Sequence, residues 1–170
     1  VKALTFDTGG TILDWHTGFS TALAELGKAH GVEGDWGMMA NDIRRGSLGR
    51  MLRLGEHEQP AYNFDGAHRA SADEVLDANG LAAATEEERH KLSWDAPHNF
   101  QCWSDFPPVL PQLRAKYICA SFTILSFRII IDTARANGLS WDAVISCEAI
   151  GKYKILPEAY LGAAKFLQLD

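Results

Sequence analysis

Residues 5 to 15 of the 170-residue chain read Thr5-Phe6-Asp7-Thr8-Gly9-Gly10-Thr11-Ile12-Leu13-Asp14-Trp15. The apolar residues before Asp7 predict a short buried strand, and Asp7 stands at its carboxyl end. Open α/β sheets bind their ligands at the carboxyl ends of the strands. The two glycines allow a sharp turn and a close approach of the backbone to a ligand, so the amides after Asp7 can point at a neighbouring anion. Asp7 is therefore a candidate nucleophile. The alternative is a tight connection in which the carboxylate only caps the turn.

Composition limits the classes of function. A chain of 170 residues can bury the core of one ordinary domain. The net charge of −6 argues against a surface for nucleic acid or for an anionic membrane. The cysteines are odd in number and widely spaced, without a Cys-x-x-Cys pair, so they indicate neither a disulfide framework nor a zinc site. The sequence opens on a strand without a signal region, which favours the cytoplasm. We expect a small-molecule substrate, no nucleic acid and no membrane as partners, and leave a homodimer open.

Helical patterns fill the chain between the first strand and the next. Apolar spacing predicts helices over residues 17–30, 39–54 and 61–79, and Thr85 with Glu88 forms a capping box that opens a short helix through Leu92. Beyond residue 110, strands and helices alternate, which predicts a parallel α/β sheet. The strands are expected at residues 117–122 and 141–147, and the helices at 110–116, at 126–137 and from Pro157 onward.

The spacing around Asp7 resembles the first motif of the haloacid dehalogenase superfamily, whose members attack their substrates with this aspartate. The shared pattern is a hydrophobic strand, Asp, two residues, Gly-Thr, two apolar residues and a second Asp. The resemblance implies an α/β fold, with a Rossmann-like parallel sheet as core and an inserted α-helical cap. We assign residues 16–99 to the cap and residues 1–15 and 100–170 to the core. The family has further strands and a fourth motif after the last helix seen here, so the resemblance implies a core that is C-terminally incomplete.

A second motif of the superfamily supplies a hydroxyl group at the end of the second core strand. Ser121 follows Lys-Tyr-Ile-Cys-Ala at residues 116–120 and stands at the expected strand end. Thr123 is the alternative if the register slips by two residues. The resemblance implies that this hydroxyl orients Asp7.

A third motif supplies a lysine near a proline. Lys154 lies in residues 153–160, which resemble the family pattern Tyr-Lys-Pro-x-Pro-x-x-Tyr, with Ile155 at the position of the first proline. The resemblance implies that Lys154 balances the charge of Asp7. Lys152 is the nearest alternative.

An arginine on the second cap helix completes the resemblance. The run Arg-Arg-Gly-Ser-Leu at residues 44–48 is similar to the arginine-bearing cap segment of 2-haloacid dehalogenases, in which that side chain faces the leaving halide or the substrate carboxylate. A planar guanidinium suits both roles. Arg45 is the alternative to Arg44, and a solvated helix face is the alternative to a role in the site. The other residues expected to bind substrate are Thr8, Gly9, Thr11 and Phe122, the last of which replaces a halide-binding asparagine of the family.

The residue two positions after the nucleophile separates two chemistries. Phosphatases of the superfamily carry a second Asp there, which protonates the leaving alcohol and helps to hold magnesium, whereas this chain has Gly9. A halide leaves without a proton. The resemblance therefore favours a hydrolase of the 2-haloacid dehalogenase type, in which Asp7 forms an ester that water cleaves, with no cofactor and no metal. The alternatives are a magnesium-dependent phosphatase that forms an aspartyl-phosphate and a truncated, inactive family member. The histidines lack the His-x-x-x-His spacing of a zinc site.

Overall fold

The fold is built on three parallel strands. A computed structural model of the chain describes residues 1–55 and 63–169. The strands β1 (Ala3–Phe6), β2 (Ile118–Thr123) and β3 (Ala143–Ser146) form a sheet in the order β1-β2-β3. After its first residue β2 is buried throughout, as a central strand of a parallel sheet is when helices cover both faces. The expected parallel α/β sheet is confirmed.

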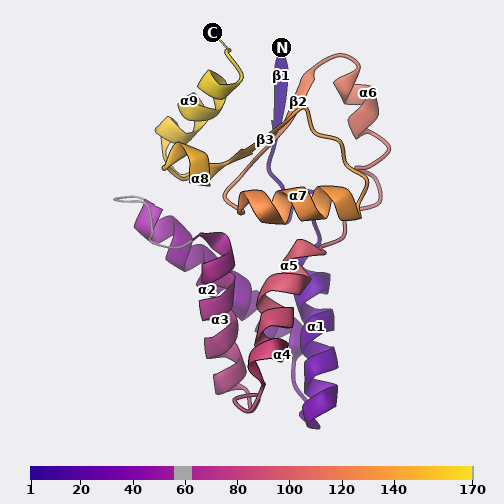
Figure 1. Cartoon of the computed structure of the whole chain (residues 1–170), viewed down its shortest axis with the longest axis vertical. Helices are drawn as coiled ribbons and strands as arrows, with labels where there is room; N and C mark the ends of the chain where they lie inside the picture. The colour runs from indigo at the N-terminus through magenta and orange to yellow at the C-terminus, as the bar shows by residue number, and fades with distance from the viewer. Residues whose placement is uncertain (56–62, 170) are drawn as a thin grey trace.

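The helices around the sheet include the three predicted from the sequence and one short helix, at residues 147–150, that the sequence did not predict. They are α6 (Leu110–Arg114), α7 (Phe127–Ala136), α8 (Cys147–Ile150) and α9 (Pro157–Phe166). The side chain of Ser126 caps α7 by accepting a hydrogen bond from the amide of Ile129 (3.2 Å), and Pro157 opens α9 at a position where a missing amide hydrogen costs nothing. In Figure 1, α7 lies between the strands and the remaining helices.

The remaining helices form a group of their own between β1 and β2 in the sequence. They are α1 (Trp15–His30), α2 (Trp36–Gly55), α3 (Phe64–Ala78), α4 (Glu86–His90) and α5 (Ala96–His98), with one π-helical turn, η1 (Lys91–Asp95). Figure 1 shows this group below the sheet. We propose that residues 16–99 form a cap on a core of residues 1–15 and 100–170.

The predicted bounds of these helices differ slightly from the observed ones. Helix α1 begins at Trp15 rather than at residue 17, because Asp14 caps it by accepting from the amide of Thr17 (3.0 Å). Helix α3 has its first residue at Phe64, and residues 61 and 62 of the predicted helix lie outside the described part of the chain. The capping box of Thr85 and Glu88 is confirmed.

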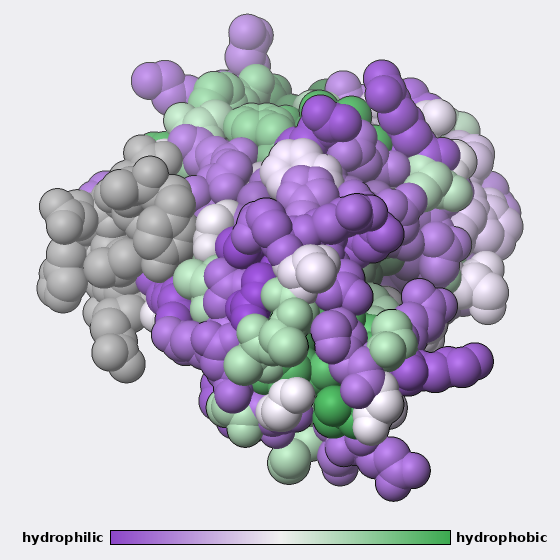
Figure 2. Space-filling view, turned by 60° about the horizontal axis from the view of Figure 1, so that its bottom comes forward, coloured by the Kyte–Doolittle hydropathy of each residue, from purple (hydrophilic) through white to green (hydrophobic). Residues whose placement is uncertain are grey.

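The surface of the cap is mostly polar. On the face shown in Figure 2, apolar side chains are confined to small patches, while the apolar residues of the helices pack inside. No helix among the described residues is both long and apolar enough to cross a membrane. All three cysteines are free thiols.

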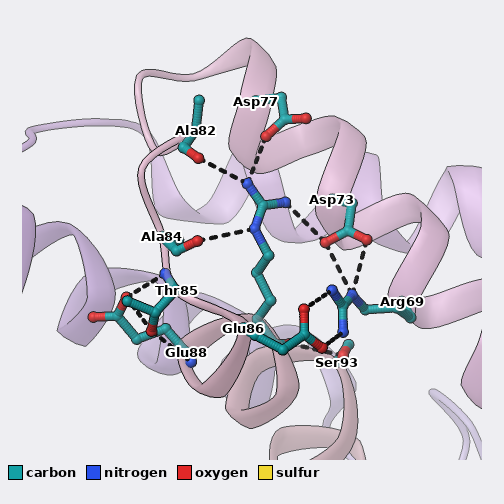
Figure 3. Close-up of polar contacts among 10 residues, drawn as sticks. Arg69, Asp73, Asp77, Ala82, Ala84, Thr85, Glu86, Glu88 and Ser93 are labelled. Atoms are coloured by element: carbon teal, nitrogen blue, oxygen red, sulfur yellow. Dashed lines mark hydrogen bonds and ion pairs between the residues drawn. The ribbon is translucent and has the colours of Figure 1, made fainter.

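An ionic network joins α3 to α4 (Figure 3). The guanidinium of Arg89 donates to the carboxylates of Asp73 (2.8 Å) and Asp77 (2.7 Å) and to two carbonyl oxygens of the loop between the helices. Arg69 binds Asp73 as well and pairs with Glu86. The Arg89 side chain is only 13% exposed. Water therefore cannot easily replace it as a donor, and we expect this network to stabilise the cap.

The variant Arg89→Ala is expected to lower the free energy of unfolding by about 2 kcal/mol, because two carboxylates and two carbonyl oxygens lose a charged donor. Urea unfolding followed by circular dichroism measures the change. Arg45→Ala is the matched control: its side chain is 77% exposed and pairs with Asp42 at the surface, so a change below about 0.5 kcal/mol is expected. Equal losses in the two variants would contradict the role given to Arg89.

Candidate active site

The turn after β1 presents Asp7 at the carboxyl end of the strand. The amide of Gly10 donates to the carbonyl of Leu13 (3.0 Å), and the amides of Ile12 and Leu13 donate to the carbonyl of Thr8 (2.9 Å each). Gly10 has a φ of 97°, which only glycine adopts without strain. The expectation that the amides after Asp7 point at an anion is therefore wrong for these three residues, because the turn itself uses their hydrogens.

The Asp7 carboxylate has one side-chain partner on each oxygen. Lys154 donates from Nζ to Oδ1 (2.7 Å), and Thr11 donates from Oγ1 to Oδ2 (2.7 Å). Lys154 also donates to the carbonyl oxygen of Phe122 (3.0 Å), and its Nζ lies 5.1 Å from the centroid of the Phe122 ring. The side chains of Asp7 and Lys154 are 43% and 19% exposed. Hydrogen bonds from the protein thus hold the ion pair on one side, and the other side is open to solvent.

The two hydroxyl candidates on β2 differ in their surroundings. Thr123 accepts hydrogen bonds from the hydroxyl of Thr8 (2.8 Å) and from the amide of Leu125 (3.1 Å). The Ser121 hydroxyl is fully buried and has no hydrogen-bond partner among the described residues. Being two residues apart, both point to the same face of the sheet. Neither is bonded to Asp7, so the role of Ser121 stays a prediction.

Arg44 reaches the site from α2. Its Nη2 donates to the carbonyl oxygen of Gly9 (3.2 Å), and its guanidinium carbon lies 5.5 Å from the ring centroid of Trp15 and 5.7 Å from that of Phe64. Burial lowers the pKa of Arg44 and the charge of Asp7 raises it in part. An arginine stays charged in proteins, and the two aromatic faces stabilise this partly buried cation. The sequence analysis missed both rings, because only the tertiary fold brings them to Arg44.

A cavity of about 260 Å³ opens beside Asp7. Its lining combines polar residues with apolar ones from both halves of the chain: Asp7, Gly9, Arg44, Leu48, Leu52, Thr123, Ile124, Leu125, Lys154 and Ile155. Thr8 and Phe122 are buried outside this lining, and so is Ser121. A pocket of this size with few polar groups suits a small molecule that has both a charged and an apolar part.

The structure also separates the alternatives left open by the sequence. Arg45 faces solvent and pairs with Asp42, and Lys152 is not part of the cavity lining. A Cβ at Gly9 would lie 3.3 Å from Cδ1 of Leu125 and 3.4 Å from Nη2 of Arg44. A larger side chain at position 9 would therefore crowd the arginine. Within the described residues, no group of three or more His, Cys, Asp or Glu side chains could hold a metal ion.

Solved structures resemble the whole chain. A defluorinating L-2-haloacid dehalogenase has a TM-score of 0.89 and 31% identity over 100% of this chain and 70% of its own. Another L-2-haloacid dehalogenase has a TM-score of 0.88 and 27% identity, covering 99% and 72%. The L-2-haloacid dehalogenase from Xanthobacter autotrophicus, with a TM-score of 0.81 and 20% identity over 100% and 66%, shows the shared fold alone. No protein-family model and no curated protein sequence matches this chain.

In the parallel α/β core, the aspartate that follows the first strand is paired with a lysine. An arginine from the helices between β1 and β2 reaches the same site. This arrangement defines a class of hydrolases. The sequence identity of 31% over the full chain shows membership of a family in addition to a shared fold. The chain belongs to the haloacid dehalogenase superfamily and, within it, to the L-2-haloacid dehalogenases, as the resemblance of its motifs implied.

Ser121 and Thr123 are expected to respond in opposite ways to removal of the hydroxyl group. Ser121→Ala should leave the free energy of unfolding unchanged or raise it by up to about 1 kcal/mol, because a buried hydroxyl without a protein partner costs free energy. Thr123→Val should lower it by about 2 kcal/mol, since it leaves the Thr8 hydroxyl and the Leu125 amide unpaired. Urea unfolding of both variants provides the measurement. A loss in Ser121→Ala as large as that in Thr123→Val would show a structural role for Ser121.

Proposed function

We propose that the chain hydrolyses the carbon–halogen bond of a short 2-haloacid with Asp7 as nucleophile. A carboxylate oxygen attacks the α carbon, the new carbon–oxygen bond forms as the carbon–halogen bond breaks, and the halide leaves with the electron pair. Water then cleaves the ester at the Asp7 carbonyl, which releases the 2-hydroxyacid and a proton and restores the carboxylate. The observation that carries this proposal is the pairing of Asp7 with Lys154 at 2.7 Å on the wall of the cavity.

Lys154 and Thr11 prepare Asp7 for this attack. Each holds one carboxylate oxygen at 2.7 Å, so the carboxylate cannot rotate freely and its attacking lone pair keeps one direction. Such orientation lowers the barrier by removing freedom before the reaction begins. Because a halide is a weak base, its departure needs no general acid, and Gly9 serves where a phosphatase would need an aspartate. The proposed reaction uses no cofactor.

Arg44 binds the negative charge of the substrate. Among the described residues that line the cavity, Arg44 and Lys154 are the cations, and Lys154 is engaged by Asp7. A 2-haloacid brings two partners for the guanidinium, its carboxylate and the departing halide, and the contact can serve either. The apolar side chains of Leu48 and Leu52, on the same helix, receive the carbon chain.

A structural relative forms a covalent complex on the same fold. The enzyme from Xanthobacter autotrophicus has been crystallised with chloropropionic acid covalently bound. At 20% identity it shares the fold, so its support is limited to the architecture. The named roles in this chain rest on the geometry around Asp7.

The direct test is chloride release from 2-chloropropionate in the presence of a chelator. The native chain should release chloride, and Asp7→Asn should reduce the rate by about a thousandfold or more, because the amide cannot form the ester. Equal rates for the two proteins would contradict the proposal. Phosphate release from a phosphomonoester that stops on chelation would point to the magnesium-dependent alternative, and a native chain without any activity would be an inactive family member.

Lys154→Met should lower kcat/KM by about a hundredfold, since the carboxylate loses its cation and one of its two fixed partners. Lys152→Met provides the comparison, because this lysine stands outside the cavity lining. Its kcat/KM is expected to stay within about twofold of the native value. Halide release at several substrate concentrations gives kcat/KM for both variants. A larger loss in Lys152→Met than in Lys154→Met would assign the role to Lys152.

A further inference from the structure

His98 lies buried where the proposed cap meets the core. It is the last residue of α5, and its Nε2 is 3.0 Å from Oδ1 of Asp65 on α3 while its Nδ1 is 2.7 Å from Oδ2 of Asp132 on α7. The side chains of His98, Asp65 and Asp132 are 4%, 8% and 20% exposed. One imidazole thus connects a cap helix with a core helix.

Each ring nitrogen of His98 lies within hydrogen-bonding distance of a carboxylate oxygen. A neutral imidazole has a single N–H, so its second nitrogen would place a lone pair against a carboxylate oxygen. An imidazolium donates to both Asp65 and Asp132. The ring of Trp94 stacks on His98 with centroids 4.1 Å apart, a contact that favours a cation. Burial lowers the pKa of His98, but the hydrogen bonds and charges of the two carboxylates outweigh it and raise the pKa overall.

The charges around this imidazole are close to balanced. The Arg128 side chain pairs with Asp132 (2.7 Å) and compensates the second carboxylate. The buried His68 is neutral, because burial and the charge of Arg44 lower its pKa to about 3. The titratable and charged groups that face or surround His98 are Asp65 and His68 on α3, Asp95 on η1, and Arg128, Asp132 and Arg135 on α7.

The first turn of α3 connects His98 to the active site. Asp65 follows directly on Phe64, whose ring lies 5.7 Å from the guanidinium carbon of Arg44. Asn63 caps this turn by accepting from the amides of Asp65 (3.1 Å) and Gly66 (3.3 Å). Because Asp65 and Phe64 are neighbours in this capped turn, we expect a displacement of Asp65 to displace Phe64 as well.

We propose that His98 is a positioning residue for Arg44. Clamped as an imidazolium between Asp65 and Asp132, it fixes the first turn of α3 on the core and so holds Phe64 against the guanidinium. The proposal deepens the proposed function, on which it rests, because Arg44 is the group that binds the substrate anion. If the proposal holds, binding of the substrate anion by Arg44 depends on the protonation of His98, which contacts the residue next to Phe64.

The clamp has a defined dependence on pH. The pKa of His98 is raised in the folded chain above its unfolded value of about 6.5. Its contribution to stability is therefore complete below pH 6.5 and is lost as the pH rises through the raised pKa. Above that pKa one carboxylate faces a bare ring nitrogen.

Nitrogen NMR of the intact chain tests the clamp without any use of activity. Both ring nitrogens of His98 should be protonated at pH 6.5, and the Nε–H signal of Arg44 should shift as His98 loses its proton. In His98→Gln that titration of the Arg44 signal should vanish. In Asp132→Asn, which keeps the imidazole and the contact with Asp65, His98 should lose its proton at a lower pH than in the native chain. An Arg44 signal that ignores the titration of His98 would overturn the proposal.

A double-mutant cycle on halide release from 2-chloropropionate tests whether His98 acts through Arg44. His98→Gln and Arg44→Lys should each lower kcat/KM about tenfold or more, and the double variant should be no worse than Arg44→Lys alone. His30→Gln is the matched control, because it breaks a histidine–carboxylate pair of the same kind, with Glu88 at 3.0 Å, inside the cap. It should leave kcat/KM unchanged, also when it is combined with Arg44→Lys.

Additive losses for His98→Gln and Arg44→Lys would overturn the proposal. If the native chain releases no halide, the proposed function fails and the NMR titration alone decides the clamp.

Discussion

The ion pair between Asp7 and Lys154 is the contact on which the site depends. The two residues are 147 positions apart, and they meet because parallel strands joined by helical crossovers bring their carboxyl ends to one edge of the sheet. The lysine also binds the carbonyl oxygen of Phe122, at the end of the middle strand. Asp7 directly follows β1 and Phe122 lies on β2, whereas Lys154 lies beyond β3 in the segment between α8 and α9, so the contact joins distant segments of the core. The sheet topology is thus a condition of the chemistry as well as of stability.

Local patterns in the sequence were sufficient for the three strands, the longer helices and the family, but not for the short helices α5 and α8. Apolar periodicity and caps such as the Thr85 box act over a few residues, so they can be recognised without the fold. The aromatic support of Arg44 could not be predicted, because Trp15 and Phe64 come from other helices and carry no signal of their own. Backbone hydrogen bonds inside the turn after Asp7 also escaped prediction, since they depend on how that turn closes.

The proposed site draws on two structural units with separate tasks. In the proposed division, the core supplies Asp7 as nucleophile and Lys154 as its cation, and the cap supplies Arg44 as the anion-binding group together with apolar wall residues. Such a division requires that the two units keep a fixed distance, because the arginine bonds directly to the carbonyl of Gly9 on the core. The contacts of His98 with Asp65 and Asp132 can fix this distance, since they join the buried Asp65 of one unit to the partly buried Asp132 of the other.

One face of α2 forms a wall of the cavity, with Arg44, Leu48 and Leu52 spaced four residues apart. Residues at this spacing share one side of a helix, and each inserted residue rotates the following part by about 100°. Under the proposed function, substitution of either leucine changes the length of substrate that fits while the contact of Arg44 with the substrate anion is kept. A single insertion or deletion earlier in the helix would turn the charge and the apolar wall away together. Under the proposed function, the range of substrates can diversify by exchange of side chains on α2 but not by a change in the length of that helix.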